Sequence, residues 1–393
     1  MKKICFSLMI LLMFCGAASA HIVYTTEGGN AGLIKISSTT SADLSANRYA
    51  SGANSVVAAY WENNTSNGAG NSKIILITPR EKSDSNFEGD TAVRFSSAES
   101  LSTPIDDANN PIVLKESYGV PVICGTNSGG SLYLATGASL REYKTSDFRF
   151  YNTYTYASSD LAPNPEIKAV TKDDNRVYVL VALNNDSNDL FITLDGTLNV
   201  NSKYSATNEV KNSKHNYAMD YISDARIVVG ADDGVYHLTN GSAVSLVSSD
   251  YPVVALCSDT GSGFYYITQH EADGVTTNSL YHYKDSKTNT ALISNITGSG
   301  AKLAKDPSYN VAGVMIGQQI SLVNMDDDKI FLTYTSSNLS GNPKSITASS
   351  TTGHSADTSS GCNLIKNGEL GIRNIFLLLS AFCGLLLMKI KIK

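Results

Sequence analysis

Short apolar segments separated by polar turns run through most of the chain, and the clearest series lies at Ile167–Asn201. The segments have the length of β-strands, and the breaks between them carry Asn, Asp or Gly, residues that favour tight turns. One antiparallel unit of this kind cannot bury both of its faces, so similar neighbouring units are expected. The predicted strands are Ile167–Thr171, Arg176–Leu183, Asp189–Leu194 and Thr197–Asn201.

Comparable units recur along the rest of the chain. A β-propeller has blades of about 40–50 residues with four antiparallel strands each, so a repeat near this length predicts that fold. Seven blades are predicted within residues 21–335, with Lys344–Ala348 as the candidate strand that completes the first blade and closes the ring. The second strands are expected to begin at or near Ile22, Ser55, Val120, Arg176, Arg226, Phe264 and Asn310, a mean spacing of 48 residues.

Apolar residues are adjacent in many of these segments, as in VYVLVAL and VVALC. Strands covered on both faces show this pattern, and blades packed between blades would cover them. In two β-sandwich domains, which are the alternative, one face of each sheet meets water, so apolar and polar residues would alternate. The predicted fold is therefore an all-β propeller, with seven blades favoured and six or eight as alternatives.

The composition supports an all-β fold and bears on the partners. Charged residues make up 17% of the chain, whereas 30 Gly and 21 Tyr suit turns and strands. Without the charged residues of the two ends, 23 basic and 35 acidic residues remain, and the resulting net charge of about −12 would repel nucleic acid. In the body, Cys124 and Cys257 each end an apolar run and are predicted to be buried thiols, although an exported protein could oxidise one pair.

Both ends of the chain have features of an exported protein. Met1–Ala20 has two lysines, an apolar run and small residues before the expected cleavage after Ala20, the order typical of a signal peptide. Residues 336–361 are rich in Ser, Thr and Gly and are predicted to form a flexible linker. Within residues 362–393, the apolar run Ile375–Met388 precedes three lysines, which predicts a membrane-spanning tail with the body on the outer side.

The end of the chain resembles the tripartite C-terminal sorting signals of bacterial surface proteins: a short motif, an apolar helix and a basic end. Gly361-Cys362-Asn363 is similar to the motif of the Synergist-type version, and the resemblance covers about Ser359–Lys393. It implies that Cys362 is the point of processing or lipid attachment and that the protein is held at the cell envelope or cell surface. The spacer Leu364–Asn374 departs from the pattern by its length. The alternative is a single-pass anchor with an incidental cysteine.

Metal-binding patterns are sparse. The acidic runs Asp173-Asp174 and Asp326-Asp327-Asp328 could offer oxygens to Ca²⁺, but each lies in a predicted turn, so no cofactor is predicted. His270–Gly274 is interpreted as a polar hairpin loop. None of the histidines of the body has the spacing of a zinc site: His21, His215, His237, His270 and His282.

Catalytic patterns are sparse as well, because the chain has no Gly-x-Ser-x-Gly elbow. Cys257–Phe264 resembles the Asp-box turn of sialidases, with Cys for its first Ser and Gly for its Thr, and a tight turn is the preferred interpretation. Tyr151, Tyr154 and Tyr156, with Trp61 at a turn, could stack on sugar rings, although the first three also suit a plain outer strand with one aromatic face.

These observations favour a surface-tethered propeller that binds a protein, peptide or glycan, and they identify no catalytic or cofactor-binding residues. An exported propeller enzyme that acts on glycans is one alternative, with carboxylates scattered over several blades. A scaffold for envelope assembly is another.

Overall fold

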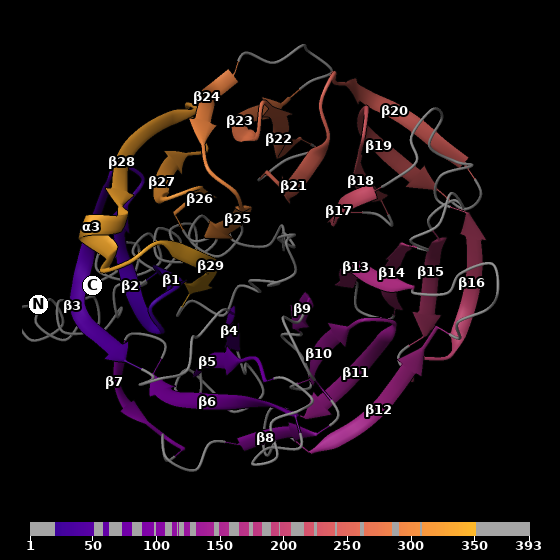
Figure 1. The fold of residues 1–393 in the computed structure, drawn as a ribbon, viewed down its shortest axis with the longest axis horizontal. Coiled ribbons are helices and arrows are strands. Elements are labelled where there is room, and N and C mark those ends of the chain that lie inside the picture. The colour runs from indigo at the N-terminus through magenta and orange to yellow at the C-terminus, as the bar shows by residue number, and fades with distance from the viewer. Residues whose placement is uncertain are drawn as a thin grey trace, which may run out of the picture. The chain divides into compact units, whose positions relative to one another are not determined.

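A computed structural model shows that the chain forms a β-propeller (Figure 1). The chain divides into a unit of Met1–Asn363, which contains the propeller, and a unit of Leu364–Lys393, which lies outside the described residues. Within the described residues no helix is both long and apolar enough to cross a membrane, and the predicted tail lies outside them. The structure describes residues 20–50, 58–62, 73–80, 89–97, 100–106, 112–115, 117, 122–125, 131–144, 149–156, 165–172, 176–182, 190–195, 197–205, 216–223, 226–239, 242–259, 263–284, 291–306 and 309–350.

Seven antiparallel sheets form the blades, as predicted, and blades 3 to 7 each have four strands that follow one another from the centre outward. Blade 3 comprises β9 (Val122–Gly125), β10 (Ser131–Thr136), β11 (Ser139–Lys144) and β12 (Phe150–Thr155). Blade 4 comprises β13 (Glu166–Lys172), β14 (Arg176–Ala182), β15 (Leu190–Asp195) and β16 (Val200–Ser205). Blade 5 comprises β17 (Asn216–Ser223), β18 (Arg226–Ala231), β19 (Gly234–Thr239) and β20 (Ser242–Ser248). Blade 6 comprises β21 (Val253–Ser258), β22 (Phe264–Ala272), β23 (Val275–Tyr283) and β24 (Ala291–Thr297). Blade 7 comprises β25 (Ala301–Asp306), β26 (Val311–Ile316), β27 (Gln319–Asn324) and β28 (Lys329–Thr335).

Blade 1 combines strands from the two ends of the propeller, which closes the ring. The N-terminal side supplies β1 (Ala20–Thr26), β2 (Asn30–Ser38) and β3 (Ser41–Ala50), and the C-terminal side supplies the innermost strand, β29 (Pro343–Ser350). β29 pairs antiparallel with β1, so that Tyr24 lies opposite Ile346. The predicted closing strand is thus confirmed. The propeller continues through α3 (Ser336–Leu339) to Ser350, so the first part of the predicted linker is structured.

Blades 2 and 3 differ from the predicted alignment. The strand near Ser55 and the strand near Val120 were expected to be second strands, but β4 (Ala58–Glu62) and β9 are innermost. Blade 2 continues with β5 (Lys73–Thr78) and β6 (Gly89–Ser97), and the outer edge of β6 is shared by β7 (Ser100–Pro104) and β8 (Ile112–Lys115). The apolar run at Ile112–Glu116 is expected from the sequence to be a strand of the third blade, whereas the structure pairs this segment, β8, with β6 of blade 2. The apolar runs near Ser55 and Val120 belong to short innermost strands, β4 with five residues and β9 with four. An apolar run alone does not show whether a strand is innermost or second in its blade, and this is why the alignment was wrong for blades 2 and 3.

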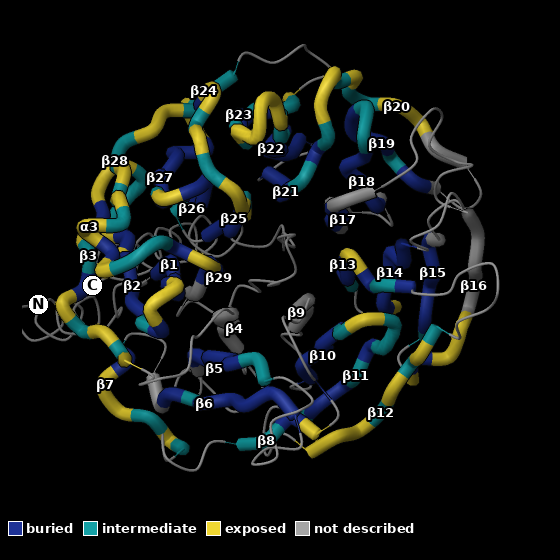
Figure 2. Tube along the Cα trace, viewed as in Figure 1, coloured by how far each residue is buried: buried dark blue, intermediate teal, exposed yellow. Residues whose placement is uncertain are grey.

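The hydrophobic core lies between the blades. Among the described residues, buried apolar side chains form seven clusters, and each cluster joins two neighbouring blades. For example, Val23 and Leu33 of blade 1 pack with Phe95 of blade 2. Figure 2 shows the consequence: middle strands such as β14 and β26 are almost wholly buried, whereas the outer strand β12 alternates between exposed and half-buried residues. Adjacent apolar residues in the sequence therefore mark strands that are covered on both faces.

Candidate functional site

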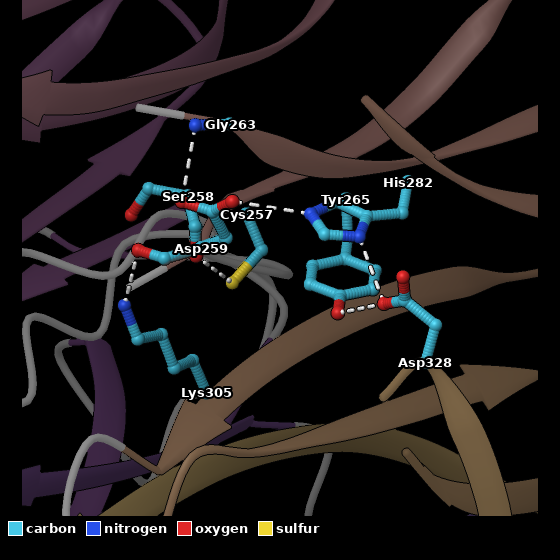
Figure 3. A network of polar contacts seen from close by, with 8 residues as sticks. All are labelled: Cys257, Ser258, Asp259, Gly263, Tyr265, His282, Lys305 and Asp328. Atoms are coloured by element: carbon cyan, nitrogen blue, oxygen red, sulfur yellow. Dashed lines mark hydrogen bonds and ion pairs between the residues drawn. The ribbon is translucent and has the colours of Figure 1, made fainter. Parts of the chain in front are cut away.

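Three segments that the sequence pattern singles out separately meet at the junction of blades 6 and 7 (Figure 3). They are the turn after β21, which contains Asp259, the end of β23, which contains His282, and the turn between β27 and β28, which contains Asp328. β22 adds Tyr265 and β25 adds Lys305. We call these five residues the blade 6–7 network, and we call the face of the ring on which it lies the network face.

His282 is at the centre of the blade 6–7 network. Its Nδ1 lies 2.8 Å from Oδ1 of Asp328, and its Nε2 lies 3.1 Å from Oδ2 of Asp259. The side chain is only 4% exposed, and the ring of Tyr265 stacks on the imidazole with 4.1 Å between centroids. The hydroxyl of Tyr265 donates a 2.6 Å hydrogen bond to Oδ1 of Asp328. A doubly protonated His282 can therefore donate to one carboxylate from each blade.

The electrostatics of the network favour that protonated form. Burial by itself lowers the pKa of His282, but the hydrogen bonds to Asp259 and Asp328 and the negative charges of these groups outweigh it, so the pKa is raised above its ordinary value. Burial also raises the pKa of the Tyr265 hydroxyl, and the hydrogen bond to Asp328 raises it further. Tyr265 is accordingly a neutral donor, and the two carboxylates favour the protonated form of His282.

The turn from β21 to β22 fixes the position of Asp259. The amide of Asp259 donates to the carbonyl of Gly263 at 3.0 Å, and the amide of Gly263 donates to Oδ1 of Asp259 at 3.0 Å. A Cβ at position 263 would collide with the main chain of Tyr283 and the carboxylate of Asp259, so only glycine fits. Lys305, which is 1% exposed, donates from Nζ to the main-chain oxygen of Asp259 at 2.6 Å. The two ends of this segment are thus hydrogen-bonded to each other, and residues 260–262 between them lie outside the described residues.

This geometry suits a structural clamp. A general base needs a free lone pair within reach of a substrate, whereas both ring nitrogens of His282 face carboxylates in a buried position. A similar link joins the neighbouring blades, because the amide of Ser258 donates a 2.8 Å hydrogen bond to the buried carboxylate of Asp220 in β17. The network face thus fastens blades 5, 6 and 7 together.

The acidic run at 326–328 has partners within the protein. Asn310 donates to Asp326 at 3.1 Å, Lys329 forms an ion pair with Asp327 at 2.8 Å, and Asp328 belongs to the network. In the part of the chain that the structure describes, no three His, Cys, Asp or Glu side chains gather as a metal site would require. Asp173 and Asp174 lie outside this part.

The structure separates the aromatic candidates from one another. Tyr154 and Tyr156 are half-buried and pack on the core between blades 3 and 4. Tyr151 is 53% exposed, and Nζ of Lys144 lies 4.1 Å from its ring centroid. β12 is an outer strand, as the alternative interpretation predicts. Trp61 lies in β4, but its side chain is not among those described.

The two predicted thiols and the two processing positions have different outcomes. Cys257 is a buried free thiol, as predicted. Cys124 lies in β9, and its side chain is outside the described set. Ala20 is the first residue of β1, and Cys362 lies beyond the described residues.

The opposite face of the ring carries a projecting hairpin. β22 and β23 have nine residues each, whereas β21 has six, and Asp273 and Gly274 join them with φ values of 53° and 74°. The hairpin loop predicted at 270–274 is therefore confirmed. Tyr251 is 40% exposed, and its ring packs against that of His270 in a tilted arrangement, with 4.3 Å between ring centroids and 35° between the ring planes. Pairing places His270 and Val275, which is 48% exposed, on one side of the hairpin. We call the face with Tyr251, His270 and Val275 the hairpin face.

Comparisons with known proteins establish the fold only. A scan against protein-family models finds no match, and neither does a search of curated protein sequences. Among solved structures, the chain is similar to a functionally unknown protein from Desulfotomaculum acetoxidans, with a TM-score of 0.54 and 10% identity over 83% of this chain and 98% of that chain. It also matches apo AztD from Citrobacter koseri, with a TM-score of 0.45 and 9% identity over 85% and 98%. The β-propeller domain of Swd1 from Myceliophteria thermophila has a TM-score of 0.44 and 9% identity over 71% and 85%.

Proposed function

We propose that this protein is exported, is held on the outer side of a membrane by its C-terminal tail, and binds a protein, peptide or glycan through the hairpin face. The leader, the apolar run Ile375–Met388 and the lysines after it motivate the export and the tether. The exposed ring contact on blade 6 motivates the choice of face.

The contact of the exposed Tyr251 ring with the ring of His270 is the observation that carries the binding proposal. A tyrosine that is 40% exposed beside a valine that is 48% exposed leaves apolar surface in contact with water, which is unfavourable by about 25 cal/mol for each Å². A ring supported on one side and open on the other can stack on a sugar ring or on a peptide side chain. Tyrosine is also among the residues that most often dominate binding energies.

The path of the chain supports the same face. β29 starts beside the first residues of β2 and ends opposite Ala20, so it runs from the hairpin face to the network face. The segment that leads to the tail therefore leaves the propeller from the network face. The chain that continues toward the tail therefore starts on the face opposite the proposed binding face.

A binding screen with the full chain tests the proposal. The detergent-solubilised protein is applied to a glycan array and a peptide array, and each hit is titrated against the Tyr251→Ala variant. We expect affinity to fall by about tenfold or more, because a stacking aromatic is a typical hot spot. Tyr151→Ala is the matched control, since Tyr151 is also an exposed tyrosine but lies on blade 3. Equal affinity of the wild type and Tyr251→Ala for every hit would refute the proposal.

A further inference from the structure

Among the described residues, the hairpin face also carries a cation that has no carboxylate partner, at the inner rim of the ring. Lys302 is the second residue of β25, the innermost strand of blade 7, and its side chain is exposed. Its Nζ lies 3.4 Å from Oγ of Ser345 in β29, the innermost strand of blade 1. No carboxylate of the described residues forms an ion pair with Lys302. The ammonium group thus has a neutral hydroxyl as its partner.

Hydrogen bonds connect the start of β25 with the hairpin. The amide of Gly298, in the connection from β24 to β25, donates to the carbonyl of Thr276 at 3.0 Å. The side-chain amide of Asn278 donates to the carbonyl of Gly298 at 2.7 Å. Lys302 therefore lies on the same face as Tyr251, four residues after a connection that rests on the hairpin.

A second positive charge lies beside Lys302. Nζ of Lys344, the second residue of β29, is 3.3 Å from Oε1 of Glu27, and Asn342 donates to Oε2 of the same glutamate at 3.0 Å. The carboxylate of Glu27 therefore interacts with Lys344 and Asn342 and not with Lys302. Partial desolvation lowers the pKa of the Lys302 ammonium group although the residue is exposed to solvent, and the positive charge of Lys344 lowers it further. A cation in this position is destabilised, and a bound anion would relieve the cost.

We propose that Lys302 and the hydroxyl of Ser345 receive the carboxylate of an acidic sugar in a glycan that binds the hairpin face. The inference rests on the proposed function and narrows its ligand class. Exposed carboxylates at Asp250, Glu271 and Asp273 surround the hairpin, so a ligand with many negative charges is repelled. A mostly neutral glycan avoids this repulsion, because its hydroxyls can donate to these carboxylates and its single anionic group meets Lys302.

Titration of the full chain with an otherwise neutral trisaccharide that carries one uronic acid residue, and with the methyl ester of that trisaccharide, tests the anionic site. We expect the acid to bind at least about tenfold more tightly than the ester, because a charge-assisted hydrogen bond is lost with the ester. Lys302→Met should abolish this preference, and Lys302→Arg should retain most of it. Lys329→Met is the control, since Lys329 is exposed and pairs with Asp327 on the network face. Equal binding of acid and ester to the wild type overturns the inference while leaving glycan binding intact.

A second measurement does not depend on glycan binding. The pKa of Lys302 is measured by NMR after isotope labelling of lysine side chains, with and without acetate as the carboxylate probe. Acetate should raise the pKa of Lys302 and leave that of Lys329 unchanged, because an adjacent anion stabilises the ammonium form. If acetate has no effect on Lys302, or if an acidic peptide gives the larger shift and tighter binding, the assignment to an acidic sugar is wrong.

Discussion

A histidine with a carboxylate at each ring nitrogen holds its proton strongly, and in this propeller the two carboxylates come from different blades. Asp259 follows the innermost strand of blade 6, and Asp328 precedes the outermost strand of blade 7. Protonation of His282 is therefore coupled to the packing of two blades. This coupling makes the stability of the protein depend on pH.

The free energy of unfolding is expected to fall as pH rises through the pKa of His282 in the folded protein. That pKa is raised above the unfolded value of about 6.5, so the contribution of His282 is fully present below about pH 6.5 and is lost at higher pH. Urea unfolding at a series of pH values measures the slope. His282→Gln should remove this slope and cost about 3 kcal/mol, the lower end for breaking a buried pair, because the side chain of Asp328 is 33% exposed.

His270→Gln is the control for this experiment, since His270 packs against an exposed tyrosine at the other end of blade 6. It should leave the pH slope of the wild type unchanged. If His282→Gln keeps the same slope, the blade 6–7 network does not hold a proton, and the structural role assigned to it is wrong.

The sequence could not reveal this network, because its members are distant along the chain. His282 is 23 residues from Asp259 and 46 residues from Asp328, and only the packing of one blade on the next brings them together. Each of the three had a visible signal of its own, namely a turn or the end of a strand. The hairpin turn at Asp273-Gly274 was predictable, because Gly and Asp between two strands favour the backbone geometry of a tight turn. Lys302 and Tyr251 had no such signal.

At the scale of strands, β29 decides whether the ring is closed. It buries Ile346 and Ala348 between blades 7 and 1, and it covers the inner edge of β1. A chain truncated after Asn342 should lose this closure, with a large fall in the urea midpoint or loss of the folded state, because a sheet edge and an apolar cluster become exposed. A chain truncated after Ser350 should unfold like the full protein. Circular dichroism during urea unfolding compares the two. Equal midpoints would show that β29 adds nothing to stability.

The strands themselves were predictable in proportion to their length and burial. β14, with six consecutive buried residues, and β26, which is buried throughout, stand out as apolar runs. The outer strand β3 has alternating exposure and few apolar residues, so no apolar run marks it in the sequence. β8 could not be assigned correctly, because both β7 and β8 pair with β6, although β7 lies between β6 and β8 in the sequence. The pattern of apolar residues does not show which two strands share a partner in this way. The number of blades was still predicted correctly, because one strand of each blade was identified and the spacing of these strands gave the length of the repeat.

At the scale of the whole molecule, the two faces of the ring differ in what their polar groups do. On the network face, buried carboxylates of Asp220 and Asp259 are bound to groups in adjacent strands or blades. On the hairpin face, Tyr251 and Lys302 are exposed, and within the described part of the chain Tyr251 contacts the ring of His270 and Lys302 contacts the hydroxyl of Ser345. A ring whose blades are clamped at one face can present exposed groups at the other without loss of rigidity. This difference between the polar groups of the two faces favours ligand binding at the hairpin face.

The tail gives the last prediction, the mass of the mature protein. If the leader is removed after Ala20 and the tail is processed at Cys362, the chain should begin at His21 and end near Cys362, with added mass if a lipid is attached there. Residues 351–361 then span at most about 40 Å from the end of β29, at about 3.5 Å per extended residue, which keeps the propeller close to its anchor. Intact-mass spectrometry of protein purified from membranes measures both ends. Cys362→Ser should retain the full tail. A wild-type chain that ends at Lys393 would instead support the single-pass anchor, which holds the protein by Ile375–Met388 itself.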